Sequence, residues 1–285
     1  MGPDPGDRRA LSAFHETAHA KLNLALHVRG RLSDGRHRIE TIFAFCEDGD
    51  ELGAQPHEHV HIHVQGPMAD QLAGPGQNLV SRAATMLMLE KACAEPNMLD
   101  GGAWITLDKR LPVAAGLGGG SADAAAALRL LTRMWNLGPV TAEEIAPRLG
   151  ADVPACLLSR PCRGCGAGDE IEPIELAELK GKPVLLVNPG VPLATADVFA
   201  AWDGIDRGPL TDWRHGRNDL EAPAIALVPE IDEVLQWMRA RPGAEFVRMS
   251  GSGATCFALF GDAAVRDRSA ESVPGHWWHM ATRLR

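Results

Sequence analysis

Tyrosine is absent from this chain of 285 residues, and its seven phenylalanines and seven tryptophans together make up only 5% of it. This absence excludes a tyrosine that stacks on a ligand or transfers a proton, so such roles fall to other side chains. Positive charge is also scarce, because 28 lysines and arginines face 37 aspartates and glutamates and leave a net charge of −9. Nucleic-acid-binding proteins usually carry a basic excess on one face, and we therefore expect no nucleic-acid partner.

Long hydrophobic runs are missing as well. No apolar stretch approaches the roughly 20 residues that are needed to cross a bilayer. The N-terminal stretch MGPDPGDRRALSAFHE lacks the apolar core of a signal peptide. We therefore expect a cytoplasmic protein with no membrane partner.

The six cysteines are too scattered for a disulfide framework in a chain of this length. Most of them are expected to be free thiols. Only Cys162 and Cys165 have the spacing of a zinc or redox pair, and no second pair follows at zinc-site spacing. A structural zinc ion is therefore not expected.

Hydrophobic patterning predicts both strands and helices. Residues 18–27 alternate with the period of a strand, which places Lys21 and Asn23 on the same face. Further strands are predicted at 39–45, 103–107, 183–190 and after a glycine turn at 249–255. Helices are predicted at 77–94, 122–131, 142–149, 197–202 and 231–239. The composition, with 45% hydrophobic residues, is that of a folded protein with one large or two ordinary domains.

Four histidines line one face of another predicted strand, HEHVHIHVQG. These are His57, His59, His61 and His63. Ligands on one flat strand face stand about 7 Å apart at each second residue, so they cannot close around one ion unaided. We interpret this face as the solvated side of an antiparallel sheet.

A glycine loop directly before an alanine-rich helix is the most informative motif. Gly116, Gly118, Gly119 and Gly120 fall within five positions and precede the predicted helix at 122–131. Unpaired N–H groups at a helix N-terminus attract anions, and glycine lets a ligand approach the backbone closely. A plain turn between strand and helix would need only one or two glycines, so phosphate binding is favoured.

Two common phosphate-binding motifs do not fit this loop. The Walker pattern needs a lysine after the glycines, which is missing. The dinucleotide-binding pattern needs a third glycine where Ser121 stands.

The pattern P-x-x-x-G-L-G-G-G-S-A at 112–122 instead resembles the phosphate loop of the GHMP kinases, the superfamily of galactokinase, homoserine kinase, mevalonate kinase and phosphomevalonate kinase. Three further stretches narrow the resemblance: AKLNLALHVRGRLSDGRH at 20–37, LGADVP at 149–154 and MSGSGAT at 249–255. Together they resemble the branch of the family that phosphorylates the 2-hydroxyl of 4-diphosphocytidyl-2-C-methyl-D-erythritol with ATP, in the non-mevalonate route to isoprenoids.

The resemblance implies an α+β fold with two lobes, an N-terminal lobe like domain 2 of ribosomal protein S5 and a C-terminal α/β sandwich. We expect an ATP-binding and catalytic lobe at 15–161 and a substrate-binding lobe at 162–285, with the substrate between them. The chain is expected to be a monomer or a homodimer.

By position, Lys21 and Asp152 match the catalytic pair of that family. A carboxylate can orient the attacking hydroxyl or take its proton, and a lysine can stabilise negative charge and keep the carboxylate ionised. Without the resemblance, Lys21 would be read as a solvated strand lysine and Asp152 as a cap or turn residue.

The resemblance also implies binding positions for ATP, with Mg²⁺ near Ser121. The ATP positions are Asn78 near the base and Pro112, Ala115, Gly116, Leu117, Gly118, Gly119, Gly120 and Ser121 along the loop. The turn at 251–253 is expected beside this loop.

The implied substrate-binding residues are Asn23, Arg36, His37, Thr195 and Phe199. The family usually has a tyrosine before His37, and here Arg36 stands in its place. Since a guanidinium can also stack on a base, we predict that Arg36 covers the cytosine opposite Phe199.

Two alternatives stay open at this point. The chain could be another kinase of the superfamily, acting on a sugar, homoserine or mevalonate. It could also be a nucleotide-binding regulator or a zinc-binding module without turnover, based on Cys162, Cys165 and the histidine strand.

Overall fold

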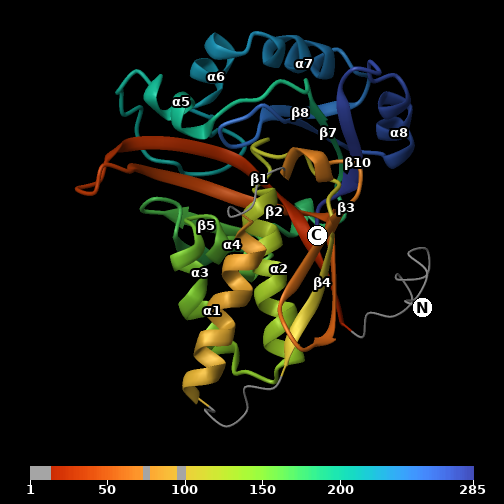
Figure 1. Cartoon of the computed structure of the whole chain (residues 1–285). Helices are drawn as coiled ribbons and strands as arrows, with labels where there is room; N and C mark the ends of the chain where they lie inside the picture. Colours follow the sequence, from red (N-terminus) through yellow and green to blue (C-terminus); the bar gives the residue numbers. More distant parts are fainter. Residues whose placement is uncertain (1–13, 73–77, 95–100) are drawn as a thin grey trace.

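The computed structural model describes residues 14–72, 78–94 and 101–285 (Figure 1). These residues form two lobes, each with its own sheet and helices, which confirms the predicted α+β, two-lobed architecture. Within the described residues, no helix has both the length and the apolar character that a membrane span requires.

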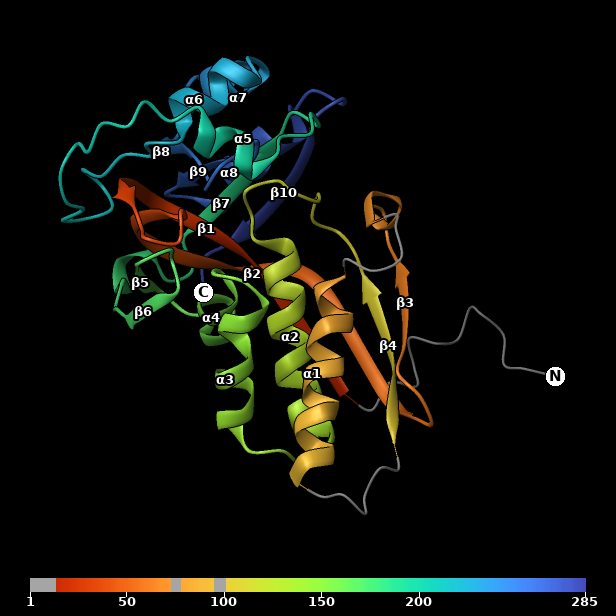
Figure 2. The ribbon, with the colours of Figure 1, turned by 60° about the vertical axis from the view of Figure 1, so that its left-hand side comes forward.

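The first lobe contains a sheet in the order β3-β4-β2-β5-β6, with β1 paired to β2. Its strands are β1 (Phe14–Arg31), β2 (His37–His57), β3 (His61–Gln65), β4 (Gly102–Asp108), β5 (Cys162–Cys165) and β6 (Glu170–Pro173). Its helices are the short 3-10 helix η2 (Ala69–Leu72), α1 (Leu79–Ala94), α2 (Gly119–Met134), α3 (Pro139–Leu149) and α4 (Val153–Leu158). Helices α1, α2 and α3 lie side by side along the sheet formed by β2, β4 and β3 (Figure 2).

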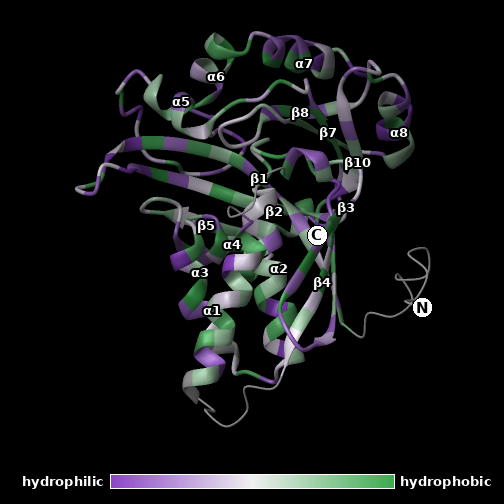
Figure 3. Ribbon diagram, viewed as in Figure 1, coloured by the Kyte–Doolittle hydropathy of each residue, from purple (hydrophilic) through white to green (hydrophobic). Residues whose placement is uncertain are grey.

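The second lobe contains an antiparallel sheet in the order β10-β7-β9-β8. Its strands are β7 (Pro183–Asn188), β8 (Ala244–Met249), β9 (Cys256–Phe260) and β10 (Trp278–Arg283). Its helices are the 3-10 helix η3 (Ala177–Leu179), α5 (Thr195–Ala200), α6 (Glu221–Leu227), α7 (Glu230–Arg239) and α8 (Ala263–Glu271). Helix α7 contains both hydrophobic and hydrophilic residues (Figure 3). Its hydrophobic residues Ile231, Val234, Leu235 and Met238 recur with helical spacing and are buried.

The long hairpin of β1 and β2 is buried on both faces and connects the lobes. On one face, Ala18 and Phe43 pack in the core of the first lobe. On the other face, Leu22 and Leu24 pack in a core that also contains Phe257 of the second sheet. Because both faces are covered, the polar residues Lys21, Asn23 and His27 of the predicted strand at 18–27 are buried as well, and buried polar residues stand out as functional candidates.

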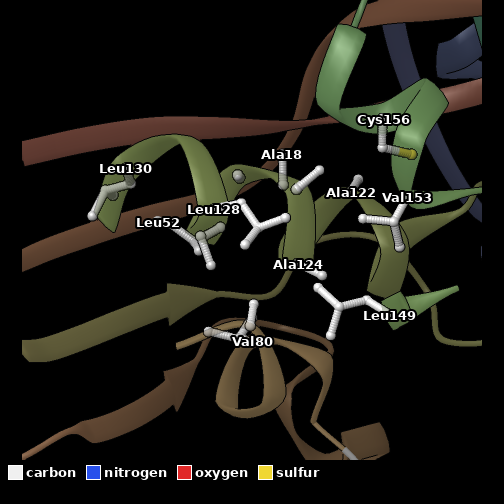
Figure 4. Close-up of a cluster of buried hydrophobic side chains, with 14 of the residues drawn as sticks. Ala18, Leu52, Val80, Ala122, Ala124, Leu128, Leu130, Leu149, Val153 and Cys156 are labelled. Atoms are coloured by element: carbon white, nitrogen blue, oxygen red, sulfur yellow. The ribbon is translucent and has the colours of Figure 1, made fainter. Parts of the chain in front are cut away.

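Helix α2 packs closely because its buried residues are small. Figure 4 shows Ala122, Ala124 and Leu128 among side chains such as Ala18 and Val80. Alanine has the highest helix propensity and adds little bulk, so the helix can approach the hairpin and α1 at short range. This packing fixes the N-terminus of α2, where the glycine loop begins.

Most predicted elements are present with shifted ends, but the single strand predicted at 57–66 is wrong. The chain bends at residues 58 and 59, so that His57 ends β2 and His61 begins β3 on the opposite side of β4. This connection crosses β4 at Gly102, where a Cβ would lie 2.2 Å from the carbonyl carbon of His59. The four histidines are nevertheless exposed, as predicted for a solvated face.

The predicted division after residue 161 falls inside the first sheet, because β5 pairs with β2 and β6 pairs with β5. The second sheet begins only with β7 at Pro183. We therefore propose that the lobes divide between β6 and β7.

Arg248 connects β8 of the second lobe to the hairpin of the first. Its guanidinium donates to the carbonyl oxygens of Leu24, Trp213 and Gly216, the Trp213 bond being 3.0 Å long. Burial lowers the pKa of Arg248 to about 10, which still leaves it charged at neutral pH.

Replacing Arg248 with methionine is expected to lower the free energy of unfolding by about 2 to 4 kcal/mol, because three buried carbonyl groups lose a charged donor. Urea denaturation would measure the change. The matched variant Arg268→Met, at an exposed arginine of α8, should stay within about 0.5 kcal/mol of the unmodified protein. Equal effects of the two substitutions would contradict the role of Arg248.

Candidate active site

The glycine loop passes directly over Lys21 of β1. The backbone N–H of Lys21 donates to the carbonyl oxygen of Leu117 at 2.9 Å. Gly118, the residue before α2, has a left-handed backbone with φ of 63°. A Cβ at Gly118 would lie 2.8 Å from the Cε atom of Lys21. Both the backbone angle and the lack of space therefore require glycine at this position.

The N-terminus of α2 has the properties of an anion site. No side chain among the described residues caps this end of the helix, so its first N–H groups can bind a ligand. Ser121 lies in this first turn and is half-buried. The loop and helix thus place N–H groups and a hydroxyl next to Lys21.

A second glycine turn, residues 250–253 of the other lobe, lies against the loop, as predicted. The hydroxyl of Ser250 donates to the carbonyl oxygen of Gly116 at 2.9 Å, and the Thr255 N–H donates to the Ala115 carbonyl at 3.1 Å. A Cβ at Gly116 would lie 2.3 Å from the Ser250 carbonyl oxygen. The loop is therefore held by both lobes.

The structure brings the predicted pair Lys21 and Asp152 together. Lys21 Nζ lies 3.1 Å from Asp152 Oδ2, and their side chains are 4% and 34% exposed. Lys21 also donates to Asn23 Oδ1 at 2.7 Å and lies over the ring of Phe43. The ammonium is therefore buried, while the carboxylate at the start of α4 remains accessible to a ligand.

The predicted ATP residue Asn78 lies at the start of α1, beside the loop. Its Oδ1 accepts from the Val80 N–H at 2.9 Å and caps the helix. The next residue, Leu79, would touch a Cβ at Gly120 at 3.8 Å. Pro112 is buried at the opposite end of the loop.

Thr195 and Asn23, two predicted substrate residues, both contact the second glycine turn. The Thr195 and Ser252 hydroxyl oxygens are 2.9 Å apart. A Cβ at Gly251 would lie 3.0 Å from Asn23 Oδ1. The sequence predicted the glycine turn that contains Ser252, but it did not identify Ser252 itself as a site residue.

His37 and Phe199, which are far apart in the sequence, stack with ring centroids 4.7 Å apart. Trp202, which sequence analysis missed, meets His37 edge-on at 5.7 Å. Burial, with a smaller effect of Arg31, lowers the pKa of His37, so its imidazole is neutral at pH 7. Among the described residues, His37 Nε2 and Trp202 Nε1 have no hydrogen-bond partner although both atoms are buried.

Arg36 lies next to this aromatic group but is held by two carboxylates. Its guanidinium contacts Asp34 at 2.7 Å and Asp169 at 3.1 Å. The ring that faces Phe199 is that of His37. Stacking of Arg36 on a base stays a prediction.

Two family domains match the chain in sequence. The GHMP kinases N terminal domain matches residues 78–160, and the GHMP kinases C terminal domain matches residues 207–277. The chain belongs to the GHMP kinases. The first match includes α2 with its glycine loop and Asp152, while Lys21 lies ahead of it on β1.

Several relatives of this GHMP kinase carry a common name. The 4-diphosphocytidyl-2-C-methyl-D-erythritol kinase of Novosphingobium aromaticivorans is 50% identical over 99% of this chain and 96% of the relative. That of Rhizorhabdus wittichii is 52% identical over 98% of both chains. A crystal structure of a 4-(cytidine 5'-diphospho)-2C-methyl-D-erythritol kinase superposes with a TM-score of 0.80 at 36% identity, covering 95% of this chain and 98% of that one.

A second buried lysine of this GHMP kinase, Lys109, was missed by sequence analysis. It lies below the loop, where a Cβ at Gly119 would be 3.1 Å from its Nζ. Its ammonium contacts the carboxylates of Asp50 and Asp123, the latter at 2.8 Å. Burial alone would lower the pKa of Lys109, but the two carboxylates raise it. No spacing in the sequence links these three residues, which come from β2, the end of β4 and α2.

The two carboxylates of this triad differ in their surroundings. Asp50 Oδ1 also accepts from the backbone N–H of Arg110 and of Leu111, so its negative charge is well stabilised. Asp123 Oδ1 has no partner among the described residues, and burial raises the pKa of Asp123 to about 8. Burial therefore disfavours the negative charge of Asp123, whereas Asp50 accepts hydrogen bonds from two backbone N–H groups in addition to Lys109.

The cysteine pair shows no sign of a metal site. Cys162 is buried in β5 and Cys165 is half-buried at its end. Within the described residues, no group of three or more histidine, cysteine, aspartate or glutamate side chains could hold a metal ion.

The different surroundings of Asp50 and Asp123 predict that replacing each of them with asparagine lowers the free energy of unfolding by different amounts. Asp50→Asn should lower the free energy of unfolding at pH 7 by at least about 2 kcal/mol, because its amide would turn an NH2 group either toward the buried ammonium of Lys109 or toward two backbone N–H groups. Asp123→Asn should change it by less than about 1 kcal/mol, because burial already disfavours the charge of Asp123 and an amide oxygen keeps its one bond, to Lys109. Urea denaturation would measure both, and a larger cost for Asp123→Asn would contradict this explanation.

Proposed function

We propose that this GHMP kinase transfers the γ-phosphoryl group of ATP to the 2-hydroxyl of 4-diphosphocytidyl-2-C-methyl-D-erythritol. The observation that carries this proposal is the Lys21–Asp152 pair, 3.1 Å apart, directly under the glycine loop. The names of the relatives described above support the choice of substrate. A cytoplasmic location and a monomeric or dimeric state stay predictions from the sequence.

In this proposal, each group of residues in the site has its own role in phosphoryl transfer. The N–H groups of the loop and of the first turn of α2 bind the phosphates of ATP, where the positive end of the helix favours negative charge. Asp152 orients the substrate hydroxyl and accepts its proton as the oxygen attacks the γ-phosphorus. Lys21 keeps Asp152 ionised and stabilises negative charge on the transferred group.

Mg²⁺ belongs to this proposal, and the donors near the loop fit it. Mg²⁺ prefers oxygen ligands and keeps several waters, so it needs only one or two protein oxygens beside the phosphates. The Ser121 hydroxyl would hold the ion, and Asp152 Oδ2 is close as well, 3.8 Å from a Cβ at Gly118. When bound, the ion neutralises charge on the phosphate oxygens.

The aromatic group of His37, Phe199 and Trp202 is proposed to bind the cytosine. Phe199 offers a ring face, and the neutral His37 can donate or accept a hydrogen bond. The buried Nε2 of His37 and Nε1 of Trp202 lack partners among the described residues, and a base that displaces the groups covering these two atoms would satisfy them with hydrogen bonds. Asn23 and Thr195, on the side toward Lys21, would bind the part of the substrate that reacts.

The proposed roles predict that Asp152→Asn lowers kcat by about 10²- to 10⁴-fold, because an amide cannot accept the proton. The KM for ATP should change little, since the loop is unaltered. A coupled assay of ATP consumption with 4-diphosphocytidyl-2-C-methyl-D-erythritol measures both. The control Asp232→Asn changes an aspartate of α7 that bonds Gln236 and should keep full activity.

Two results would contradict this proposal. Full activity of Asp152→Asn would exclude Asp152 as the base. Phosphorylation of homoserine, mevalonate or a sugar in place of the cytidylylated alcohol would exclude the proposed substrate.

If Arg36 stacks on the cytosine, Arg36→Ala should raise the KM for the cytidylylated substrate about three- to tenfold and leave the KM for ATP unchanged. Arg38→Ala, at the exposed arginine nearby that bonds the Arg29 carbonyl, serves as the control. An unchanged KM in Arg36→Ala would show that the base is bound by the aromatic group alone.

A further inference from the structure

A buried chain of hydrogen bonds leads from Thr41 on β2 through Asn23 to Lys21. The three residues are 0%, 2% and 3% exposed. Asn23 Nδ2 donates to Thr41 Oγ1 at 2.8 Å, and Lys21 Nζ donates to Asn23 Oδ1 at 2.7 Å. Thr41 belongs to none of the sequence motifs described above. Its hydroxyl bonds Asn23 and the Ala25 carbonyl, and neither bond involves the glycine loop or Asp152.

The direction of each bond follows from the number of available protons. The Thr41 hydroxyl has one proton, and it donates this proton to the Ala25 carbonyl oxygen at 2.7 Å. Toward Asn23 the hydroxyl can therefore only accept, so the amide must turn its nitrogen to Thr41. The amide oxygen then faces Lys21, which has three donors and no acceptor. A flipped amide would place donor against donor at Lys21 and acceptor against a hydroxyl without a free proton at Thr41.

Backbone pairing keeps Thr41 in place. It pairs with Leu26 of β1 and with Gly164 of β5. Its methyl group packs closely over the latter, since a Cβ at Gly164 would lie 3.1 Å from Thr41 Cγ2. The hydroxyl is thereby directed toward Asn23 by a side chain that is stiff at χ1.

We propose that Thr41 is a positioning residue for phosphoryl transfer, because its hydroxyl fixes the orientation of the Asn23 amide and so holds the Lys21 ammonium against Asp152. This inference rests on the proposed function and adds a residue whose side chain bonds Asn23 and the Ala25 carbonyl. Removal of the hydroxyl leaves the amide free to turn, and in the turned state Lys21 loses an acceptor and is pushed away from Asp152.

The test compares Thr41→Val, which removes only the hydroxyl and keeps the shape, with Thr41→Ser, which keeps the hydroxyl. In Thr41→Val, kcat should fall about tenfold or more, while the KM for ATP and the affinity for ADP, measured by calorimetry, stay within about twofold. Thr41→Ser should retain more than half of the original kcat. A purely structural role would lower the melting temperature without separating kcat from nucleotide binding.

The matched control is Thr132→Val on α2. Thr132 is also a buried threonine, but its hydroxyl has no partner among the described residues, so the same chemical change should leave kcat unaltered. If Thr41→Val does not fold, Thr41→Ala removes the same hydroxyl without adding any bulk and takes its place in the comparison.

A double-mutant cycle tests whether Thr41 acts through Asn23. In an Asn23→Ala background there is no amide to orient, so adding Thr41→Val should lower kcat by less than about twofold further. An additional tenfold loss would overturn the inference.

Failure of the inference and failure of the proposed function are distinguishable. Thr41→Val with unchanged kcat would overturn the positioning role while the unmodified enzyme still phosphorylates its substrate. An unmodified protein that leaves 4-diphosphocytidyl-2-C-methyl-D-erythritol unphosphorylated would overturn the proposed function and the inference together.

Discussion

The buried ammonium of Lys21 is the constraint on which the rest of the site depends. A charge that has lost nearly all contact with water is stable in a protein only when hydrogen-bond acceptors and an opposite charge surround it. Asn23, Asp152 and the ring of Phe43 supply these partners, and they come from β1, the start of α4 and β2. Stabilising the lysine therefore brings the three elements of the active site together.

A comparison of the two buried lysines explains why only one of them is suited to chemistry. The carboxylates beside Lys109, those of Asp50 and Asp123, are 0% and 4% exposed, so that this triad is closed to any ligand. Asp152, beside Lys21, is 34% exposed. The same type of ion pair thus serves to anchor α2 at one place and to meet a substrate at the other, and the accessibility of the carboxylate makes the difference.

Close approach of backbone segments is the second constraint. The loop must touch Lys21 at Gly118 and the second lobe at Gly116, and neither position has room for a Cβ. The small residues of α2 allow the helix to lie against the β1–β2 hairpin, which brings its N-terminus to the lysine. The proposed phosphate site therefore lies where the two lobes and the shared hairpin meet.

Elements with strong local signals could be predicted from the residues alone. The alternation at 18–27 placed Lys21 and Asn23 on one face, and their side chains are bonded in the structure. The glycines at 116–120 and the alanines behind them marked the loop and α2, because backbone freedom and helix propensity are local properties. Matches to family motifs added Asp152, His37 and Phe199, which no local pattern would have distinguished from cap, loop or core residues.

Contacts between residues that are distant in the sequence could be identified only from the folded chain. The predicted histidine strand is two strands in the structure, the end of β2 and β3, and these pair with opposite edges of β4. Folding also assembles the Lys109 triad, places Trp202 beside His37 and connects Thr41 to Asn23. These contacts join residues from separate elements, and burial and hydrogen bonding between such elements leave no periodic trace in the sequence.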